Sequence, residues 1–288
     1  MKLALGTVQF GLAYGIANAE GQVPEDEAAR ILAAARAAGI DMLDTAAAYG
    51  EAERVLGRIG IKGWRIVTKV PALPAGTGNP RAWVRDVIAR SLANLGTEQV
   101  DAVLLHRAQD LAGPDGAELW AGLRDVQDAA LCTRIGVSVY TPDDLAALPE
   151  AVTPGLVQAP FNVFDRRLET SGWADRLAAQ GTALHLRSAF LQGLLLMPPT
   201  ARPARFHPFD ATFARWDDFL AETGQSPLEA ALGLALSRPW AERVVVGVDS
   251  GAQLDHILIA AANAGLSASA DLASDDTRLI DPSKWSSK

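Results

Sequence analysis

The sequence alternates eight times between short apolar runs and longer Ala-rich amphipathic segments. The short runs have the length and composition of β-strands, and we expect strands over Leu3–Thr7, Ile40–Asp44, Arg65–Val70, Val100–His106, Arg134–Val139, Leu156–Ala159, Ala183–Ser188 and Arg243–Val248. Strands separated by helices make a parallel sheet, and eight such units close most economically into a barrel. We therefore predict an α/β fold, a single (β/α)8 TIM barrel over residues 1–288.

Helix signals lie between the predicted strands. A helix over Pro24–Ala38 begins with a proline and acidic residues and ends at a glycine, and a second begins at Asn79–Pro80 and ends near Leu95. The alternative is an open, doubly wound sheet in two domains. It is less favoured because no Gly-x-Gly-x-x-Gly follows the first strand and no linker divides the chain. Further helix N-caps are expected at Thr141, Ser226 and Asp249–Ser250.

Two segments are longer than the repeating unit. Leu194–Pro208 is proline-rich and cationic, and it follows the seventh strand at the face where barrel loops build sites. The polar tail Ser267–Lys288 is expected to cover the barrel mouth.

Composition excludes several classes of function. The 26 basic and 34 acidic residues give a net charge of −8, and no basic tract is present, so we expect no nucleic-acid or anionic-membrane partner. The lone Cys132 excludes a disulfide framework and a multi-thiolate metal site, and we predict no metal. The N-terminal apolar run is too short for a signal peptide and no run is long enough to span a bilayer, so we expect a soluble, cytoplasmic protein. Its oligomeric state is left open.

Polar residues lie at or near the ends of three consecutive predicted strands. Asp44, Lys69 and His106 lie at or near the carboxyl ends of these strands, the end where barrels carry their chemistry. Alternation puts Lys69 on the same face as Val67, and His106 on the same face as Leu104. If those apolar residues face inward, the polar side chains enter the barrel mouth. Each alone has a structural explanation, as a cap, a solvent-reaching amine or a hydrogen-bonded strand residue, but together they predict a site.

Tyr49 follows Asp44 by five residues and completes the candidate set. A buried ammonium needs an anion, and Asp44 can supply it to Lys69. A phenol beside that ammonium is expected to have a pKa below its usual ~10, because the positive charge favours phenolate. A neutral His106 can hydrogen-bond a carbonyl oxygen and orient it. The four residues therefore suit carbonyl reduction, with Tyr49 as general acid and no covalent intermediate.

Six segments around these residues stand in the order of a known family. They are GTVQFGLAYG (6–15), LDTAAAYGEAERVLG (43–57), VTKV (67–70), LLHR (104–107), GVSVYTPDDL (136–145) and VVVGVDSGAQL (244–254). On these motifs the chain resembles the aldo-keto reductase superfamily over nearly its whole length. The resemblance implies a barrel that uses NADPH, or less often NADH. It also implies that Tyr49 is the proton donor and Lys69 lowers its pKa, while Asp44 holds Lys69 and His106 orients the carbonyl.

The resemblance further implies a set of cofactor-binding positions. Ser138 and Gln158 match residues that hold the nicotinamide carboxamide. Val139 stands where the family commonly has Asn, with Asn162 as a candidate replacement. Arg187 stands where many members have an aromatic residue that stacks on the nicotinamide, and a guanidinium plane can also stack. The other matching positions are Gly6, Thr7, Ser188, Phe190, Leu191, Gly193, Gly247, Asp249, Ser250 and Gln253.

The segment after the eighth strand bears on the choice of dinucleotide. The resemblance implies that backbone amides at the start of the following helix bind phosphate there. Members that prefer NADP(H) often have Lys early and Arg later in this segment, where this chain has Gly247 and Gln253. Asp249 points toward NAD(H) or toward use of both dinucleotides, because a carboxylate repels a 2′-phosphate and accepts from a free 2′-hydroxyl. If Asp249 only caps the helix, Ser250 is left to take the phosphate. On family frequency we place NADP(H) ahead of NAD(H).

A polar mouth is expected to receive the substrate. Its residues suit a polyhydroxylated aldehyde, such as an aldose, better than a steroid. The sequence therefore predicts an NAD(P)-dependent aldo-keto reductase of the carbonyl reductase or aldose dehydrogenase type, acting on a small carbonyl compound in either direction. The predicted substrate residues are Tyr14, Gln9, Arg107 and Trp285.

Two other interpretations use the same residues. In the first, Lys69 is the Schiff-base nucleophile of an aldolase-type lyase, which leaves Asp44 and the phosphate-loop match unexplained. In the second, the barrel binds a nicotinamide cofactor without turnover and serves as a redox-responsive subunit. The intact set of four residues argues against lost chemistry.

Overall fold

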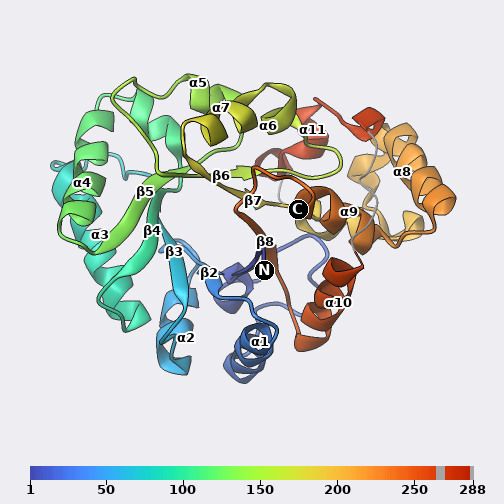
Figure 1. The fold of residues 1–288 in the computed structure, drawn as a ribbon, viewed down its shortest axis with the longest axis horizontal. Coiled ribbons are helices and arrows are strands. Elements are labelled where there is room, and N and C mark those ends of the chain that lie inside the picture. The colour runs from blue at the N-terminus through green and yellow to red at the C-terminus, as the bar shows by residue number, and fades with distance from the viewer. Residues whose placement is uncertain (264–269, 286–288) are drawn as a thin grey trace.

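Eight parallel strands form a closed barrel in the computed structural model, which describes residues 1–263 and 270–285 (Figure 1). Each strand pairs with the next in sequence, and β8 pairs with β1 to close the ring. The eight predicted strands and the barrel are confirmed, with ends that differ by a few residues. The strands are β1 (Leu3–Gly6), β2 (Met42–Asp44), β3 (Arg65–Val70), β4 (Val100–Leu105), β5 (Cys132–Ser138), β6 (Leu156–Pro160), β7 (Ala183–Arg187) and β8 (Arg243–Gly247).

Helices surround the barrel on its outside (Figure 1). They are α1 (Glu25–Ala37), α2 (Ala52–Ile59), α3 (Pro80–Leu95), α4 (Gly116–Asp128), α5 (Pro142–Ala146), α6 (Arg167–Thr170), α7 (Trp173–Ala179), α8 (Asp210–Thr223), α9 (Pro227–Leu236), α10 (Gly251–Ala262) and α11 (Thr277–Ile280). Short 3₁₀ helices occupy several loops, namely η1 (Val8–Phe10), η2 (Ala108–Ala112), η3 (Leu191–Leu196), η4 (Pro199–Ala201), η5 (Ala204–Phe209), η6 (Ala270–Leu272) and η7 (Pro282–Lys284). None of these described helices is long and apolar enough to cross a membrane.

The predicted helix caps form. The Thr141 and Ser226 side chains each accept a hydrogen bond from the third backbone amide of their helix, and each belongs to a reciprocal capping box. At α10 the cap is Ser250, whose hydroxyl accepts from the amide of Gln253. The capping role therefore falls to Ser250 and not to Asp249, and the carboxylate of Asp249 is left for other contacts.

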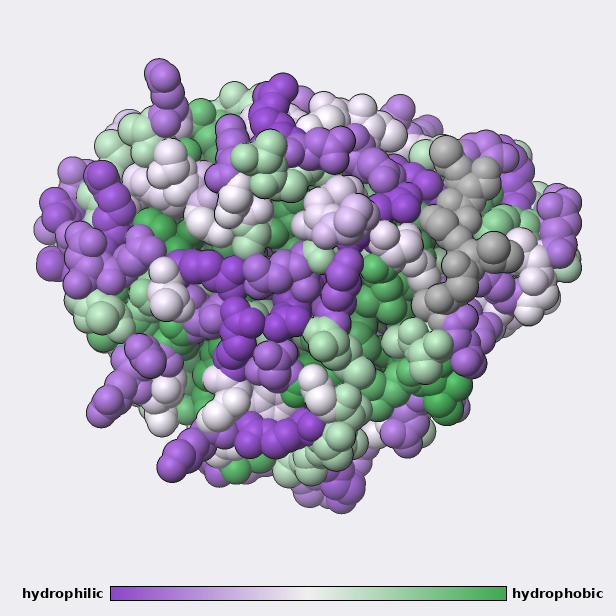
Figure 2. All heavy atoms as spheres, in the orientation of Figure 1, coloured by the Kyte–Doolittle hydropathy of each residue, from purple (hydrophilic) through white to green (hydrophobic). Residues whose placement is uncertain are grey.

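The apolar residues divide into an inner and an outer layer. The inner cluster fills the barrel and contains Ala4, Met42, Val67, Ala102, Leu104 and Leu156. A much larger cluster lies between the strands and the helices. Because Val67 and Leu104 face inward, the alternation argument holds for the polar residues that follow them on β3 and after β4. Figure 2 shows hydrophilic side chains around the rim and across the middle of the visible face.

The long segment after β7 passes through η3, η4 and η5 to α8, at one edge of the molecule (Figure 1). Its Arg202 pairs with both carboxylate oxygens of Asp217 on α8, at 2.5 and 2.7 Å. This ion pair lines a cavity of about 310 Å³ between the segment and α8. The positive charge of Arg202 is therefore already balanced within this segment.

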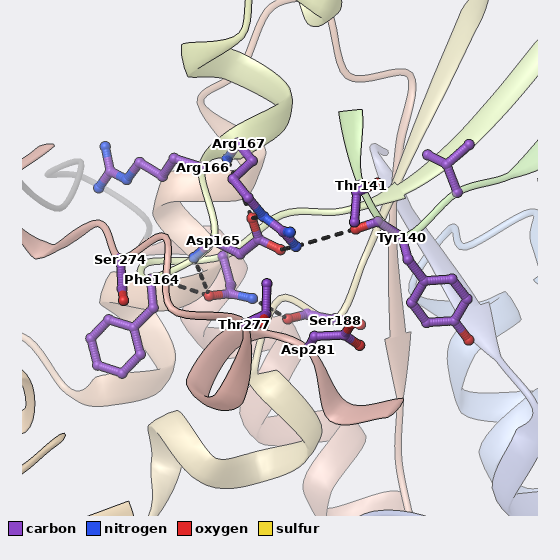
Figure 3. A network of polar contacts seen from close by, with 12 residues as sticks. Tyr140, Thr141, Phe164, Asp165, Arg166, Arg167, Ser188, Ser274, Thr277 and Asp281 are labelled. Atoms are coloured by element: carbon purple, nitrogen blue, oxygen red, sulfur yellow. Dashed lines mark hydrogen bonds and ion pairs between the residues drawn. The ribbon is translucent and has the colours of Figure 1, made fainter. Parts of the chain in front are cut away.

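The described part of the tail packs at the carboxyl ends of β6 and β7. The amide of Ser274 donates to the carbonyl of Phe164, in the loop after β6, at 2.8 Å (Figure 3), and Trp285 packs against Phe206 in the segment after β7. This placement agrees with the predicted cover at the barrel mouth. Residues 267–269 and 286–288 of the predicted tail lie outside the described residues.

Candidate active site

Asp44 and Lys69 form a buried ion pair where β2 and β3 end. The ammonium Nζ of Lys69 donates to Asp44 Oδ2 at 2.6 Å and to the carbonyl of Thr45 at 3.0 Å. Lys69 is fully buried and Asp44 is 4% exposed. Burial acts to lower the pKa of Lys69, but the charge of Asp44 and the nearby phenol outweigh it and raise that pKa above its usual value. Lys69 therefore stays charged at neutral pH.

Tyr49 lies on the turn between β2 and α2 and points at this ion pair. Its hydroxyl oxygen accepts from Lys69 Nζ at 3.4 Å, and Nζ lies 5.1 Å from the ring centroid. The turn is fixed by backbone hydrogen bonds and by close packing against Gly11. A Cβ atom on Gly11 would come within 1.8 Å of the Tyr49 carbonyl oxygen, so only glycine fits there. The position of the phenol thus depends on a glycine in the segment after β1.

The acidity of Tyr49 differs from the sequence expectation. Burial raises the pKa of Tyr49 above its usual value, Lys69 acts to lower it, and Asp44 acts to raise it. The expected lowering of this pKa was wrong for the protein alone, because removal of the phenol from water outweighs the nearby ammonium. At neutral pH Tyr49 is a protonated phenol, which is the form that a proton donor needs.

His106 follows β4 and stands edge-on to Tyr49. The two ring centroids are 5.7 Å apart with an interplanar angle of 78°. Burial, followed by the positive charges of Lys69 and Arg187, lowers the pKa of His106 to about 4. The imidazole is therefore neutral near pH 7, and one of its nitrogens carries a proton that it can donate to a carbonyl oxygen.

Gln158 in the middle of β6 makes a contact that the sequence did not suggest. Its side-chain nitrogen donates to Asp44 Oδ1 at 2.7 Å, so both oxygens of this carboxylate have partners. Ser138, the other predicted carboxamide-binding residue, is the strand neighbour of Gln158 in the barrel. The hydroxyl and amide of Thr7 both donate to the Asp44 carbonyl at 3.0 Å. Gln158 and Thr7 therefore hold Asp44 in place for Lys69.

Arg187, the last residue of β7, is half-buried at the mouth. Its guanidinium lies 4.4 Å from the ring centroid of Tyr140, a residue that the sequence reasoning missed. It donates to the Val139 carbonyl at 3.0 Å and to the Ser188 hydroxyl at 3.2 Å. The aromatic face and these two acceptors fix the guanidinium plane.

The loop after β7 is locally strained. Ser188, Leu191 and Gln192 have positive φ angles of 61°, 49° and 55°, and Gly193 has one of 89°. Non-glycine residues in this region are uncommon and cluster at ligand-binding segments. Across the mouth, a Cβ on Gly193 would lie 2.5 Å from that of Ala17, so the loop contacts the segment after β1. Of the other two predicted cofactor residues of this loop, Phe190 is half-buried and Leu191 is fully buried.

A polar network holds this loop from behind (Figure 3). Asn162 donates to the Ser188 carbonyl at 3.2 Å and accepts from the amide of Asp165 at 2.9 Å. Arg167 pairs with both oxygens of Asp165 and donates to the Tyr140 carbonyl at 3.2 Å. Asn162 therefore supports the loop, and its role as a replacement for the Asn that is common in the family stays a prediction.

The start of α10 carries more negative charge than the sequence suggested. Glu27 of α1 accepts from the Gly251 amide at 2.7 Å, a contact between distant segments that no local pattern predicts. Asp249 accepts from the side chain of Asn18 at 3.1 Å, and its own amide donates to Gln253 at 2.8 Å. Burial raises the pKa of Asp249.

The predicted substrate residues separate into two groups. Tyr14 and Gln9 lie on the segment after β1: the Tyr14 hydroxyl accepts from Gln192 at 3.3 Å, and Gln9 packs against Gly247. Arg107 pairs with Asp110 at 3.2 Å, and Trp285 packs against Phe206 with a ring-centroid distance of 5.0 Å. The structure brings the first group to the mouth, whereas Arg107 pairs with a neighbour on its own segment and Trp285 packs on the long segment after β7. Gly6 is the strand neighbour of both Asp44 and Gly247.

The comparisons with known proteins agree with this arrangement. A 6-dehydroglucose reductase from Novosphingobium aromaticivorans is 29% identical over 270 residues, which is 88% of this chain and 85% of the relative. An L-glyceraldehyde 3-phosphate reductase from Escherichia coli is 26% identical over 232 residues, which is 72% of this chain and 66% of the relative. A putative aldo-keto reductase structure from Pseudomonas aeruginosa is 27% identical, covers 91% of this chain and 90% of its own, and has a TM-score of 0.68.

A second solved structure supports the fold alone. An aldo-keto reductase from Bacillus halodurans has a TM-score of 0.74 at 19% identity and covers 96% of this chain and 95% of its own. The aldo/keto reductase family matches residues 2–270. Because this match extends over almost the whole sequence, the chain belongs to the aldo/keto reductase family.

Proposed function

We propose that this protein reduces a sugar-type aldehyde or ketone to an alcohol with a nicotinamide cofactor, or catalyses the reverse reaction, with Tyr49 as the proton donor. The family makes the chain an oxidoreductase that acts on carbonyl compounds. One observation carries the assignment of the site: a neutral phenol lies 3.4 Å from a buried ammonium that a carboxylate balances, with a neutral imidazole edge-on to it.

Features of the mouth support the binding of a dinucleotide. The Oε1 atom of Gln9 is buried without a hydrogen-bond partner among the described residues, although Gln9 packs against Gly247 where β8 ends. A polar group in that state is costly unless a ligand satisfies it. The strained loop follows the carboxyl end of β7, and Ser138 at the end of β5 is the strand neighbour of Gln158 on β6. These residues fit the cofactor that the family uses.

The chain's own residues divide the chemistry between them. The bound cofactor supplies or accepts the hydride. The Tyr49 hydroxyl delivers a proton to the oxygen of the reduced carbonyl, and the adjacent Lys69 stabilises the phenolate that remains. His106 donates a hydrogen bond that orients the carbonyl oxygen. Asp44, held by Gln158, keeps Lys69 in position.

The start of α10 favours a cofactor without a 2′-phosphate. Glu27 already accepts from the first amide of this helix, and Asp249 adds a second carboxylate. If the adenosine end binds there, as the family resemblance implies, both carboxylates repel a phosphate. We therefore propose that NAD(H) binds at least as tightly as NADP(H), against the family frequency. Titration of the protein with NADH and NADPH tests this, and a Glu27→Gln variant should move the preference toward NADPH.

The polar residues at the mouth, Tyr14 and Gln9, support a hydroxylated substrate. Two relatives bear names of sugar-derived substrates, 6-dehydroglucose and L-glyceraldehyde 3-phosphate. A panel of sugar aldehydes and hydrophobic ketones tests the substrate class. A sharply better kcat/KM for the hydrophobic ketones would contradict it.

The central experiment compares Tyr49→Phe with Tyr14→Phe. The first removes the proposed acid, and turnover should fall by about 10²–10⁴-fold while cofactor binding is retained. The second removes the hydroxyl of a mouth tyrosine that contacts Gln192, and its loss of turnover should be far smaller. Normal reduction by Tyr49→Phe would overturn the assignment of the acid.

Each of the two other interpretations predicts a distinct experimental outcome. A Schiff-base lyase would be trapped by borohydride with a carbonyl substrate and no cofactor. The full burial of Lys69 and its pairing with Asp44 disfavour this, because a charged amine is not a nucleophile. A cofactor-binding subunit without catalysis would show cofactor binding and no turnover with any carbonyl compound.

A further inference from the structure

The charges at the barrel mouth do not balance. The positive charge of Lys69 is neutralised by Asp44, and His106 is neutral near pH 7. Arg187 is different: among the described residues, no carboxylate forms an ion pair with its guanidinium, which contacts a carbonyl, a hydroxyl and the Tyr140 ring. The next cation along this rim, Arg167, is paired with Asp165. Among the residues that the structure describes, the mouth therefore keeps one uncompensated positive charge, that of Arg187.

This charge is permanent and fixed in position. An arginine stays protonated at any pH that the fold tolerates. The Tyr140 ring and the two hydrogen-bond acceptors hold the guanidinium plane, and the half-buried setting weakens screening by solvent. The charge of Arg187 acts on Tyr49, His106 and Tyr14, the residues that surround the reaction site.

We propose that Arg187 makes the site discriminate between the two redox states of the cofactor, so that the reduced form binds more tightly than the oxidised form. The inference rests on the proposed function, since it requires a nicotinamide ring in the mouth. For hydride transfer, a bound nicotinamide ring would have to lie beside a carbonyl carbon whose oxygen Tyr49 and His106 hold. Because the charge of Arg187 acts on both Tyr49 and His106, a ring in that place would also lie within its field. The reduced ring is neutral and the oxidised ring carries one positive charge, so the guanidinium repels only the oxidised form.

This discrimination bears on the direction of the reaction. Carbonyl reduction moves a hydride from the ring to carbon and a proton from Tyr49 to oxygen, and it leaves the added positive charge on the ring. Repulsion from Arg187 then favours release of the oxidised cofactor. In the opposite direction the enzyme would have to bind the repelled form first. The site is therefore suited to carbonyl reduction under conditions where both forms are present.

The test is a set of binding titrations, without turnover, of NADH and NAD⁺ and of NADPH and NADP⁺. The wild-type protein should bind the reduced form more tightly. Arg187→Met and Arg187→Gln should each reduce the ratio of oxidised to reduced Kd by about tenfold, as expected for a unit charge some ångströms from the ring in a partly buried site. Arg187→Lys, which keeps the charge, should keep the ratio to within about twofold.

Arg176→Met is the matched control. Its guanidinium also lies 4.4 Å from an aromatic ring centroid, that of Trp173, but on the outer helix α7. It should leave both dissociation constants unchanged. Thermal unfolding of each variant checks the fold, and the Gln variant retains a hydrogen-bonding group if the Met variant is unstable.

Three results would count against the proposal. The proposal would be overturned directly if the wild type bound the oxidised and reduced forms with equal Kd. It would also be overturned if both neutral variants kept the wild-type ratio of oxidised to reduced Kd. An equal loss of affinity for both redox forms would assign the guanidinium to a cofactor phosphate instead. Failure of the wild type to bind any nicotinamide dinucleotide would instead overturn the proposed function on which this inference depends.

Discussion

The two ends of the barrel both concentrate charged side chains, but they balance them differently. At the amino ends of the strands, Arg65 and Arg134 both pair with Asp101, at 2.9 and 2.5 Å. Arg134 also pairs with Glu242 at 3.0 Å, and Glu242 accepts from the buried His185 at 3.3 Å. At the carboxyl ends, Lys69 and Asp44 form a complete ion pair and the imidazole of His106 is neutral. The guanidinium of Arg187 there has no carboxylate partner among the described residues.

The difference separates structural charge from functional charge. At the amino end every cation of the group has an anion in contact, and the hydrogen bond from His185, together with Arg134, holds the pKa of Glu242 well below its usual range. A closed group of this kind joins β3, β4, β5, β7 and the start of β8. At the mouth, burial dominates the pKa of both Tyr49 and His106, so those groups stay neutral beside fixed charges. Neutral groups in a fixed field can exchange protons or hydrogen-bond a ligand.

The largest effect is expected from Lys69→Met at the mouth. It leaves the 4% exposed Asp44 charged without its ammonium partner, which should cost about 3–5 kcal/mol of unfolding free energy. Turnover should fall by at least about 10²-fold, because the phenolate of Tyr49 loses its stabilising charge. Denaturant unfolding and kcat measure the two effects. The double variant Asp44→Asn/Lys69→Met should regain most of the stability and none of the turnover, and recovery of both would contradict the role given to Lys69.

A smaller effect is expected from His106 in acid. Its pKa is about 4 in the folded protein, below the usual value of 6.5, so the unfolded chain binds the extra proton between these values. Folding stability should therefore fall as the pH falls from 6.5 to 4, by at most about 3 kcal/mol from this group. A His106→Asn variant should lack this part of the loss. Denaturant unfolding at several pH values gives both curves, and parallel curves for the two proteins would refute the assignment.

The smallest effect is expected from Arg134→Met at the opposite end. Its side chain is 22% exposed, and Asp101 keeps Arg65 as a partner, so the loss should be about 1–2 kcal/mol of unfolding free energy. Turnover should stay near that of the wild type. The same unfolding and kcat measurements apply. A large loss of kcat without a loss of stability would break the distinction between the two ends.

Most of the fold could be predicted from the sequence because its signals are local. Strand runs, helix caps and stop residues act within a few positions, as the capping boxes at Thr141 and Ser226 illustrate. The pair Asp44 and Lys69 was also accessible, since both end neighbouring strands on the inward face. The expected pKa of Tyr49 was wrong because the depth of burial of a side chain is not a local property. The site roles taken from the family resemblance stay predictions until the variants are measured.

The sequence by itself determined that eight strand–helix units would close into a barrel, and that an acid, a phenol, an amine and an imidazole would meet at one end of it. Only the tertiary structure decided which partners those groups found. Gln158 reaches Asp44 across 114 positions, Glu27 reaches α10 across 224, and Arg187 meets Tyr140 rather than a carboxylate. The physical reason is the sequence separation over which each determinant acts. Hydrophobic periodicity and helix capping act between residues that are close in sequence, whereas strand register and barrel closure bring together charged residues that no local pattern relates.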